Sequence, residues 1–443
     1  MDYVPHTSED QRQMMETIGI RSITDLFVDI PEKYQLKKLM NLPPALSEQE
    51  VFTLMKGISV QNAISPVTLM GAGAYHHYIP AVVGHVISRS EFYTAYTPYQ
   101  AEISQGILQA IYEYQSMIAK LTGMQVANAS MYDGASAMAE AAVLAAKTLN
   151  RTKIVIVRSV HPEYRQVVST YAWSNGYEVV EVPYNKSGQL DQESLLKAVD
   201  ESTAAVLVQS PNFFGVIEDI SLIAPAVHEK GALLVAGFTE ATSLGILKPA
   251  GSMGADFVVG EGQSFGNPMN YGGPYLGIFA GTDKFLRKIP GRLAGATVDR
   301  EGRRGFVLTL QTREQHIRRE RATSNICSNE ALCALAAAVY LVSLGKNLRK
   351  LAELNIHNTH YLKQRLSGLK GWDVVFPAPV YNEIVVRCPN PRAVNKKLQA
   401  EGIIGGYEVE KDYPELKNTL LLCATEMLTK EDIDRVVLTV KAI

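Results

Sequence analysis

Residues 254–277, GADFVVGEGQSFGNPMNYGGPYLG, decide the fold predicted for this chain. The stretch begins as a short apolar strand, continues as a polar loop rich in glycine, and returns to an apolar strand over 275–281. In open α/β sheets, such a junction at the carboxyl edge of the strands is where the chemistry takes place. Yet the only ionisable side chains between Asp256 and Gly281 are Glu261 and two tyrosines. The loop therefore has the form of an active site without a nucleophile.

Upstream of this stretch, short apolar segments alternate with helical ones, which is the pattern of a parallel sheet with crossover helices. We expect strands at 153–158, 178–184, 204–212, 232–238 and 256–260, and helices near 162–174, 191–200 and 221–230. A smaller α/β pattern follows, with strands at 372–377, 382–388 and 419–425 and helices at 346–367, 391–401 and 429–442. The sequence therefore predicts an α/β chain with a large, doubly wound, mostly parallel sheet domain and a small C-terminal α/β domain.

The length of 443 residues is too great for one compact core of the usual size. Prolines interrupt residues 1–60, which can form only short helices such as 9–19 and 48–56. We expect 1–60 to be a helical arm that lies on a larger body or on another subunit. We expect 61–325 to be the large domain and 326–443 the small one.

The composition is that of a soluble globular protein, with 47% apolar and 20% charged residues. A net charge of −2 gives no general attraction to nucleic acid or anionic membranes. The longest apolar stretches, such as 139–146, are much shorter than a membrane span, and the polar, acidic N-terminus does not resemble a secretory signal. The four cysteines form no CxxC pair. We therefore expect a cytoplasmic protein with reduced thiols and no nucleic-acid or membrane partner.

An irregular segment rich in Gly, Tyr, His and Pro covers 71–106, and only 81–88 within it could be helical. Its tyrosine hydroxyls and histidine nitrogens each need a partner, which makes the segment poor core material. It is either a structural or interface loop, or the lining of a site in this subunit or a neighbour's. His76 and His77 are adjacent, so their side chains should diverge, and we expect no metal site.

A turn at Asp133-Gly134 opens a long alanine-rich helix. Small residues with free N–H groups at a helix start form an anion site, commonly for phosphate. Because many helices without a ligand begin in the same way, a phosphate site and an ordinary helix start are both open interpretations.

A basic segment lies at about 303–325, with arginines at most of its charged positions. It is either a solvated connector with local ion pairs or a surface that binds carboxylates or the acidic face of a partner.

The order of these parts, with an arm, a large doubly wound domain and a small α/β domain, resembles the fold-type I enzymes that use pyridoxal phosphate. Residues 91–106, 112–142 and 267–277 closely resemble glycine decarboxylase, the P-protein family of the glycine cleavage system. The similarity covers essentially the whole chain. The length, roughly half that of the single-chain form, is similar to that of subunit 1 in the family's split, two-subunit form.

The resemblance implies that two positions of the cofactor site are replaced. The cofactor-bearing half of this family carries a His-Lys-Thr-Phe run before a proline and a glycine tract, and its lysine binds the cofactor. Aligning Phe265 and Pro268 with that pattern puts Gln263 in the place of the lysine. Ala236 stands where the family has the aspartate that pairs with the pyridinium nitrogen. The resemblance thus implies that this chain binds no cofactor covalently.

The resemblance further implies a catalytically silent subunit that pairs with a lysine-bearing homologue, subunit 2, in a heterodimer or heterotetramer. Pyridoxal phosphate would sit in the partner, and the pair would decarboxylate glycine and pass the aminomethyl group to the lipoyl group of the H-protein. Expected wall residues of the partner's site are Tyr96, Tyr99, Gln100, Glu102, Gly272 and Gly273. His161 would lie over the cofactor ring or be structural, and Arg387 is a weaker candidate for binding the substrate carboxylate.

Two other interpretations compete with this one. The chain could be an independent fold-type I enzyme, such as a desulfurase or aminotransferase, with Lys248 or Lys284 as its anchor. It could also be a structural or regulatory homologue that pairs with nothing catalytic.

Overall fold

The structure, a computed structural model, describes residues 5–38, 40–65, 67–322, 324–326 and 330–441. Residue contacts divide the chain into two units, 1–63 and 64–443. The first unit contains α1 (Ser8–Ile18) and α2 (Glu48–Ser59), which confirms the two helices predicted there, together with the 3-10 turns η1 (Ile23–Phe27) and η2 (Glu32–Tyr34). None of the described residues of this unit is buried. Its helices therefore lack a core within the unit.

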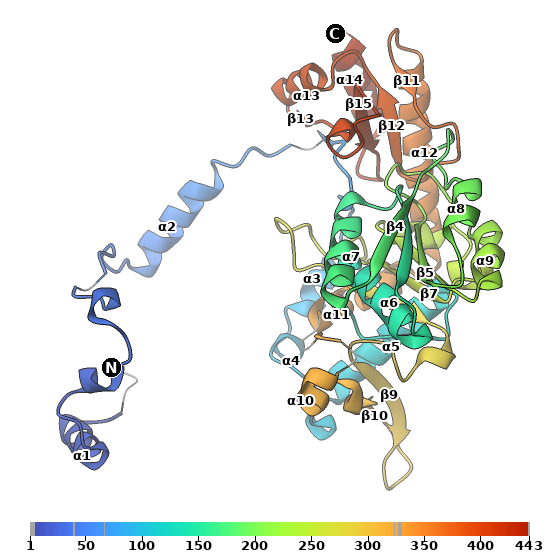
Figure 1. Cartoon of the computed structure of the whole chain (residues 1–443). Helices are drawn as coiled ribbons and strands as arrows, with labels where there is room; N and C mark the ends of the chain where they lie inside the picture. The colour runs from blue at the N-terminus through green and yellow to red at the C-terminus, as the bar shows by residue number, and fades with distance from the viewer. Residues whose placement is uncertain (1–4, 39, 66, 323, 327–329, 442–443) are drawn as a thin grey trace. The chain divides into compact units, whose positions relative to one another are not determined.

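The second unit is built on a mixed sheet (Figure 1), in which the described residues form seven strands in the order β2-β8-β7-β6-β5-β3-β4. The neighbours from β7 to β4 are parallel, whereas β8 is antiparallel to β7 and β2 is antiparallel to β8. The prediction of a mostly parallel sheet is therefore confirmed. The strands are β2 (Val126–Ala127), β3 (Lys153–Val157), β4 (Glu178–Val182), β5 (Thr203–Gln209), β6 (Leu233–Phe238), β7 (Phe257–Glu261) and β8 (Gly277–Gly281).

Helices cover this sheet and connect its strands. The alanine-rich helix α6 packs against α7 and against strands β5 to β8, and α9 packs against β6. Small side chains let α6 approach the sheet closely, so most of its length is buried. The helices of this part are α3 (Ala81–Ile87), α4 (Ser90–Tyr93), α5 (Gln105–Thr122), α6 (Gly134–Leu149), α7 (Pro162–Asn175), α8 (Gln192–Ala198) and α9 (Ile220–Glu229).

A second, smaller sheet lies in the C-terminal part of the chain, where the described residues form four antiparallel strands in the order β11-β12-β15-β14. It has its own hydrophobic cluster, which contains Trp372, Ile384 and Leu421. The elements are α11 (Ala331–Leu344), α12 (Leu348–Ser367), β11 (Asp373–Val374), β12 (Glu383–Arg387), α13 (Pro391–Ala400), β14 (Tyr407–Glu408), β15 (Thr419–Cys423) and α14 (Lys430–Lys441). The predicted strand over 372–377 is shorter than expected, and a short parallel pair, β1 (Val67–Thr68) with β13 (Ile403–Ile404), was not predicted.

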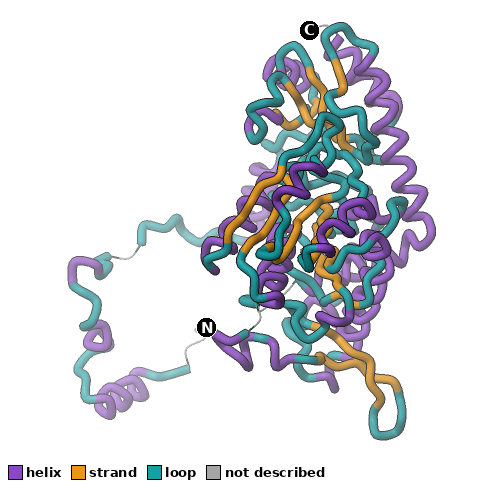
Figure 2. Tube along the Cα trace, turned by 45° about the vertical axis from the view of Figure 1, so that its right-hand side comes forward, coloured by secondary structure: helices purple, strands orange, loops and turns teal. Residues whose placement is uncertain are grey.

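The basic segment begins with a strand that the sequence did not predict. Strands β9 (Leu293–Val298) and β10 (Arg304–Thr309) form an antiparallel hairpin that projects from the rest of this unit (Figure 2). Phe306 and Leu308 of β10 are buried in a small cluster with Leu108 of α5. Arg304 and Gly305 precede Phe306, and the apolar Val307 lies between Phe306 and Leu308, so the period-two signal of the strand is weak. The short helix α10 (Gln315–Arg318) follows the hairpin.

One helical stretch, Ala331–Ser367, is long and apolar enough to cross a membrane by length and composition alone. Half of its most apolar window is buried inside the protein. Because α11 packs against α3 and α5, its apolar residues belong to the core of this fold.

Candidate functional site

Gln263, at the predicted lysine position, lies buried just after the carboxyl end of β7. Its Oε1 accepts the N–H of Tyr75 at 3.0 Å, and its Nε2 donates to the carbonyl oxygens of Tyr75 at 3.1 Å and Asn267 at 2.7 Å. A lysine could make the donor contacts but could not accept from the Tyr75 N–H. The amide of Gln263 therefore joins the loop after β7 to the tyrosine-rich segment, and its hydrogen-bonding atoms are all engaged.

The start of α6, the predicted anion site, holds a carboxylate of the chain itself. Glu261, the last residue of β7, accepts the N–H of Gly134 at 3.0 Å and the N–H groups of Gln263 and Leu276 at 2.9 Å each. Burial raises the pKa of Glu261 to about 7, and the nearby Asp133 adds to this, although the three N–H donors favour the ionised form. The free N–H group that made this helix start a phosphate candidate thus already has an acceptor.

Residues 71–77 contact the chain near the carboxyl ends of β5 and β6. The carbonyl of Ala72 lies 2.8 Å from Nε2 of His161, and the Tyr75 hydroxyl contacts Oγ1 of Thr239 at 3.0 Å and donates to Glu383 at 2.8 Å. Gly73 has φ +102°, and a Cβ at this position would lie 2.7 Å from Nε2 of His161. Only glycine permits this close approach. His161 therefore contacts the chain's own backbone here.

His77 is buried between two carboxylates. Its Nε2 lies 2.9 Å from Glu240 and its Nδ1 lies 2.7 Å from Glu426. Burial alone would lower the pKa of His77, but the two carboxylates outweigh it and raise the pKa to about 10. His77 is therefore a cation that joins the loop after β6 to the loop after β15. Sequence reasoning missed Glu240, Glu383 and Glu426, because none of them belongs to a local motif.

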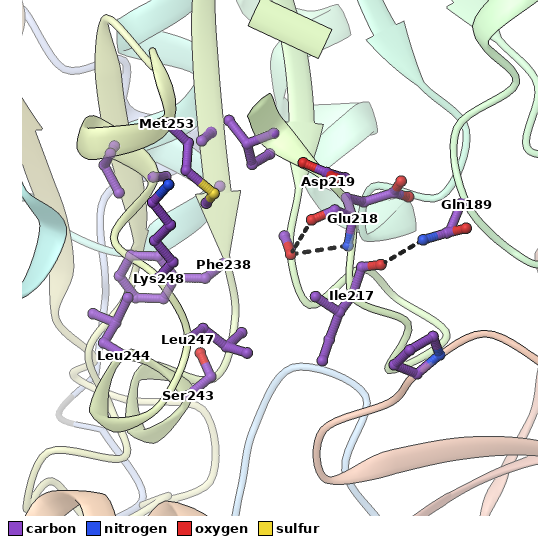
Figure 3. A pocket seen from close by; sticks show the side chains of 17 residues that line it. Gln189, Ile217, Glu218, Asp219, Phe238, Ser243, Leu244, Leu247, Lys248 and Met253 are labelled. Carbon is purple, nitrogen blue, oxygen red and sulfur yellow. Dashed lines mark hydrogen bonds between the residues drawn. The ribbon is translucent and has the colours of Figure 1, made fainter. Parts of the chain in front are cut away.

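Gln263 and Ala236, the two positions that the resemblance singled out, line different cavities. Gln263 lines a cavity of about 680 Å³ together with Tyr75 and Tyr271. Ala236 lines another of about 300 Å³, shown in Figure 3, where Lys248 and Glu218 lie on opposite sides. Neither of these two cavities is lined by both Gln263 and Ala236.

The predicted wall residues lie mostly on the surface. Tyr96 is 82% exposed, and Gln100 and Glu102 are exposed as well. The hydroxyl of Tyr99 lies 3.3 Å from the guanidinium of Arg292, and its ring lies 5.1 Å from that of His316. None of these four side chains lines the Gln263 cavity or the Ala236 cavity.

The two glycines of the predicted wall, Gly272 and Gly273, have φ +109° and +140°. They follow Tyr271, which is fully exposed and is one of the residues that line the Gln263 cavity.

The other candidate residues lie elsewhere. Lys284 forms an ion pair with the buried Asp256 at 2.8 Å, and Arg387 is exposed at the end of β12. Within the described parts of the chain, no group of three or more His, Cys, Asp or Glu side chains could hold a metal ion.

Pyridoxal phosphate, the cofactor implied by this kind of fold, does not fit the residues present. There is no lysine in the loop after β7, and a second anion at the start of α6 would face the carboxylate of Glu261. Residues 71–77 are hydrogen-bonded to Gln263 and His161, and Ala236 offers no charge to a ring nitrogen. This chain's own site is therefore not built to hold the cofactor.

The fold defines a chain of the fold-type I class, and the residues at its site do not fit the cofactor of that class. Two solved structures show the same fold. A sphingosine-1-phosphate lyase from Burkholderia pseudomallei matches with a TM-score of 0.66 and 14% identity over 93% of this chain and 94% of that one. A NifS-like protein matches with a TM-score of 0.64 and 15% identity over 86% of this chain and 99% of that one. The model of the glycine cleavage system P-protein matches residues 1–440, and the chain belongs to this family.

More similar proteins agree with the family assignment. A crystal structure of glycine decarboxylase (P-protein) of the glycine cleavage system, in inhibitor-bound form, matches with a TM-score of 0.90 and 42% identity over 100% of both chains. The probable glycine dehydrogenase (decarboxylating) subunit 1 of Anoxybacillus flavithermus is 53% identical over 98% of this chain and 97% of its own length. The protein of the same name from Carboxydothermus hydrogenoformans is 51% identical over 99% of this chain and 98% of its own length.

We expect the Gln263→Lys variant to remain unable to bind pyridoxal phosphate covalently in this loop. Glu261 still occupies the start of α6, Ala236 still offers no charge to a ring nitrogen, and the new ammonium group would lose the acceptor contact to Tyr75. The measurement is borohydride reduction in the presence of pyridoxal phosphate, followed by peptide mapping. A stoichiometric label in the peptide that contains loop 262–276 would contradict this prediction, and the wild-type chain controls for labelling of surface lysines.

Proposed function

We propose that this chain is the subunit without a cofactor lysine of a two-subunit glycine dehydrogenase (decarboxylating), in which it completes the site of its partner. The observation that carries the proposal is Gln263, because its amide replaces the lysine and is fully engaged with Tyr75 and Asn267. The names of the relatives support it, since proteins called subunit 1 match nearly the full length of the chain.

The partner in this proposal is a lysine-bearing homologue, subunit 2, that holds pyridoxal phosphate. When bound there, the cofactor accepts the electrons released as glycine loses carbon dioxide. The aminomethyl group then passes to the lipoyl group of the H-protein. The contribution of this chain is to line the cavity, exclude water and orient the substrate.

The wall facing the partner comprises the surface around Tyr96, Tyr99, Gln100 and Glu102, together with Gly272 and Gly273. Exposed tyrosines support this assignment, because an aromatic side chain with a polar tip is typical of surfaces that become covered. The hydroxyl of Tyr99 is held by Arg292, so it is already oriented before a partner binds.

The N-terminal arm, 1–60, is proposed to pack on the partner subunit. Nearly half of the large apolar side chains that are exposed among the described residues lie in the unit 1–63, which makes up only about one seventh of the chain. Such a concentration of apolar surface is typical of a segment that another chain covers. We propose that the rest of the chain divides into a large domain, 61–325, and a small domain, 326–443. The two kinds of subunit are proposed to form a heterotetramer in the cytoplasm.

Reconstitution tests the proposal. We expect this chain alone to show no visible absorbance with added pyridoxal phosphate and no exchange of labelled bicarbonate into glycine. Mixed with a lysine-bearing homologue from the same organism, it should yield both signals. Exchange activity of this chain alone, or full activity of the lysine-bearing homologue without it, would contradict the proposal. Co-purification of the two chains is the independent readout.

A further inference from the structure

The start of α6 binds two carboxylates of different origin. Asp133 is the ordinary N-cap and accepts the N–H of Ser136 at 2.7 Å. Glu261 comes from the end of β7, 127 residues further along the chain, and accepts the N–H of Gly134 at 3.0 Å. Asp133 caps the N–H of Ser136, and Glu261 supplies the acceptor for the N–H of Gly134.

The two oxygens of Glu261 divide their contacts between the helix and the glycine-rich loop. One oxygen accepts from Gly134, and the other accepts from Gln263 and Leu276 at 2.9 Å each. Gln263 and Leu276 lie near the two ends of loop 262–276, which carries Tyr271 and the wall glycines. One buried side chain therefore holds both ends of this loop against the first turn of α6.

We propose that Glu261 is a built-in anion, which occupies the helix start where an anionic ligand group would otherwise bind and thereby positions loop 262–276. A helix N-terminus attracts an anion, and buried N–H groups without an acceptor are unfavourable. The carboxyl group of Glu261 accepts these hydrogen bonds without an external ligand. The effect of Glu261 on activity rests on the proposed function, because it requires that loop 262–276 lines the partner's site. The effect of Glu261 on the stability of the isolated chain is independent of the proposed function.

Removal of the carboxylate should open the helix start to an external anion. We expect Glu261→Ala to lower the Tm of the isolated chain, and we expect inorganic phosphate to raise it again by roughly 2 °C or more through mass action. Sodium chloride at the same ionic strength should not reproduce the rise, and the wild-type chain should show no specific response to phosphate.

Glu218→Ala is the matched control. Glu218 is also buried and accepts hydrogen bonds from Leu190, Asn212 and Ser159, but it does not contact the start of α6. This variant should lose stability without responding to phosphate. An equal response to phosphate in Glu218→Ala and Glu261→Ala would overturn the inference, as would an equal response in the wild-type chain.

A milder variant keeps the test decisive if Glu261→Ala does not fold. Glu261→Gln retains only one acceptor oxygen. We therefore expect at least one of the backbone amides of Gly134, Gln263 and Leu276 to exchange its hydrogen faster than in the wild-type chain. Unchanged exchange at all three amides would overturn the inference. In the reconstituted enzyme, we expect either variant to lower kcat; inactivity of the wild-type mixture would instead count against the proposed function.

Discussion

Replacement of His77 by glutamine should lower the free energy of unfolding by about 3–5 kcal/mol. The imidazolium lies between Glu240 and Glu426 and is almost completely buried. A neutral amide leaves two buried carboxylates facing each other without a cation between them. Chemical denaturation of the isolated chain measures the loss. His76→Gln is the control, because the His76 side chain is only partly buried, and it should change the stability little.

The effect of His77 should depend on pH in a definite direction. The carboxylates raise the pKa of His77 in the folded chain to about 10, compared with about 6.5 in an unfolded chain. The folded state therefore binds more protons between these values, and the contribution of His77 is complete below pH 6.5 and is lost as the pH rises through 10. The difference in stability between wild type and His77→Gln should shrink over that range. A difference that stays constant or grows would contradict the assignment of a charged His77.

Replacement of Gly134 by alanine should destabilise the chain by about 3 kcal/mol. A Cβ at this position would lie 2.1 Å from the Tyr164 hydroxyl and 2.8 Å from the backbone N of Glu261. The hydroxyl could move, but the backbone of β7 is fixed by its neighbours in the sheet. The first turn of α6 must therefore shift away from the strand, and the bond from Gly134 to Glu261 is lost. Thermal unfolding of the isolated chain measures the change.

Gly106→Ala provides the control for the glycine substitution. Gly106 lies in α5, and a Cβ there meets nothing within 4 Å. In a helix, this change should be neutral or stabilise by about 0.5–1 kcal/mol. Similar Tm values for Gly134→Ala and Gly106→Ala would show that α6 does not approach β7 as closely as the structure indicates.

Local patterns were sufficient for most of the elements of the fold. The alternation of apolar strands and amphipathic helices predicted β3 to β7 and the helices between them, because strand and helix periods are readable within about ten residues. The hairpin β9–β10 was missed, since Phe306 and Leu308 gain their burial only through contact with α5, nearly 200 residues earlier in the sequence.

The site shows the same division between local and long-range information. The sequence by itself determined the lack of a lysine in loop 262–276 and the small residues at the start of α6, because both follow from residue identity and position. Only the tertiary structure decided the partners of the buried charges. His77 contacts Glu240 and Glu426 at separations of 163 and 349 residues, and Glu261 contacts Gly134 at 127. Such pairings depend on how loops from both sheets and the start of α6 come together in the folded chain, and no local pattern encodes that geometry.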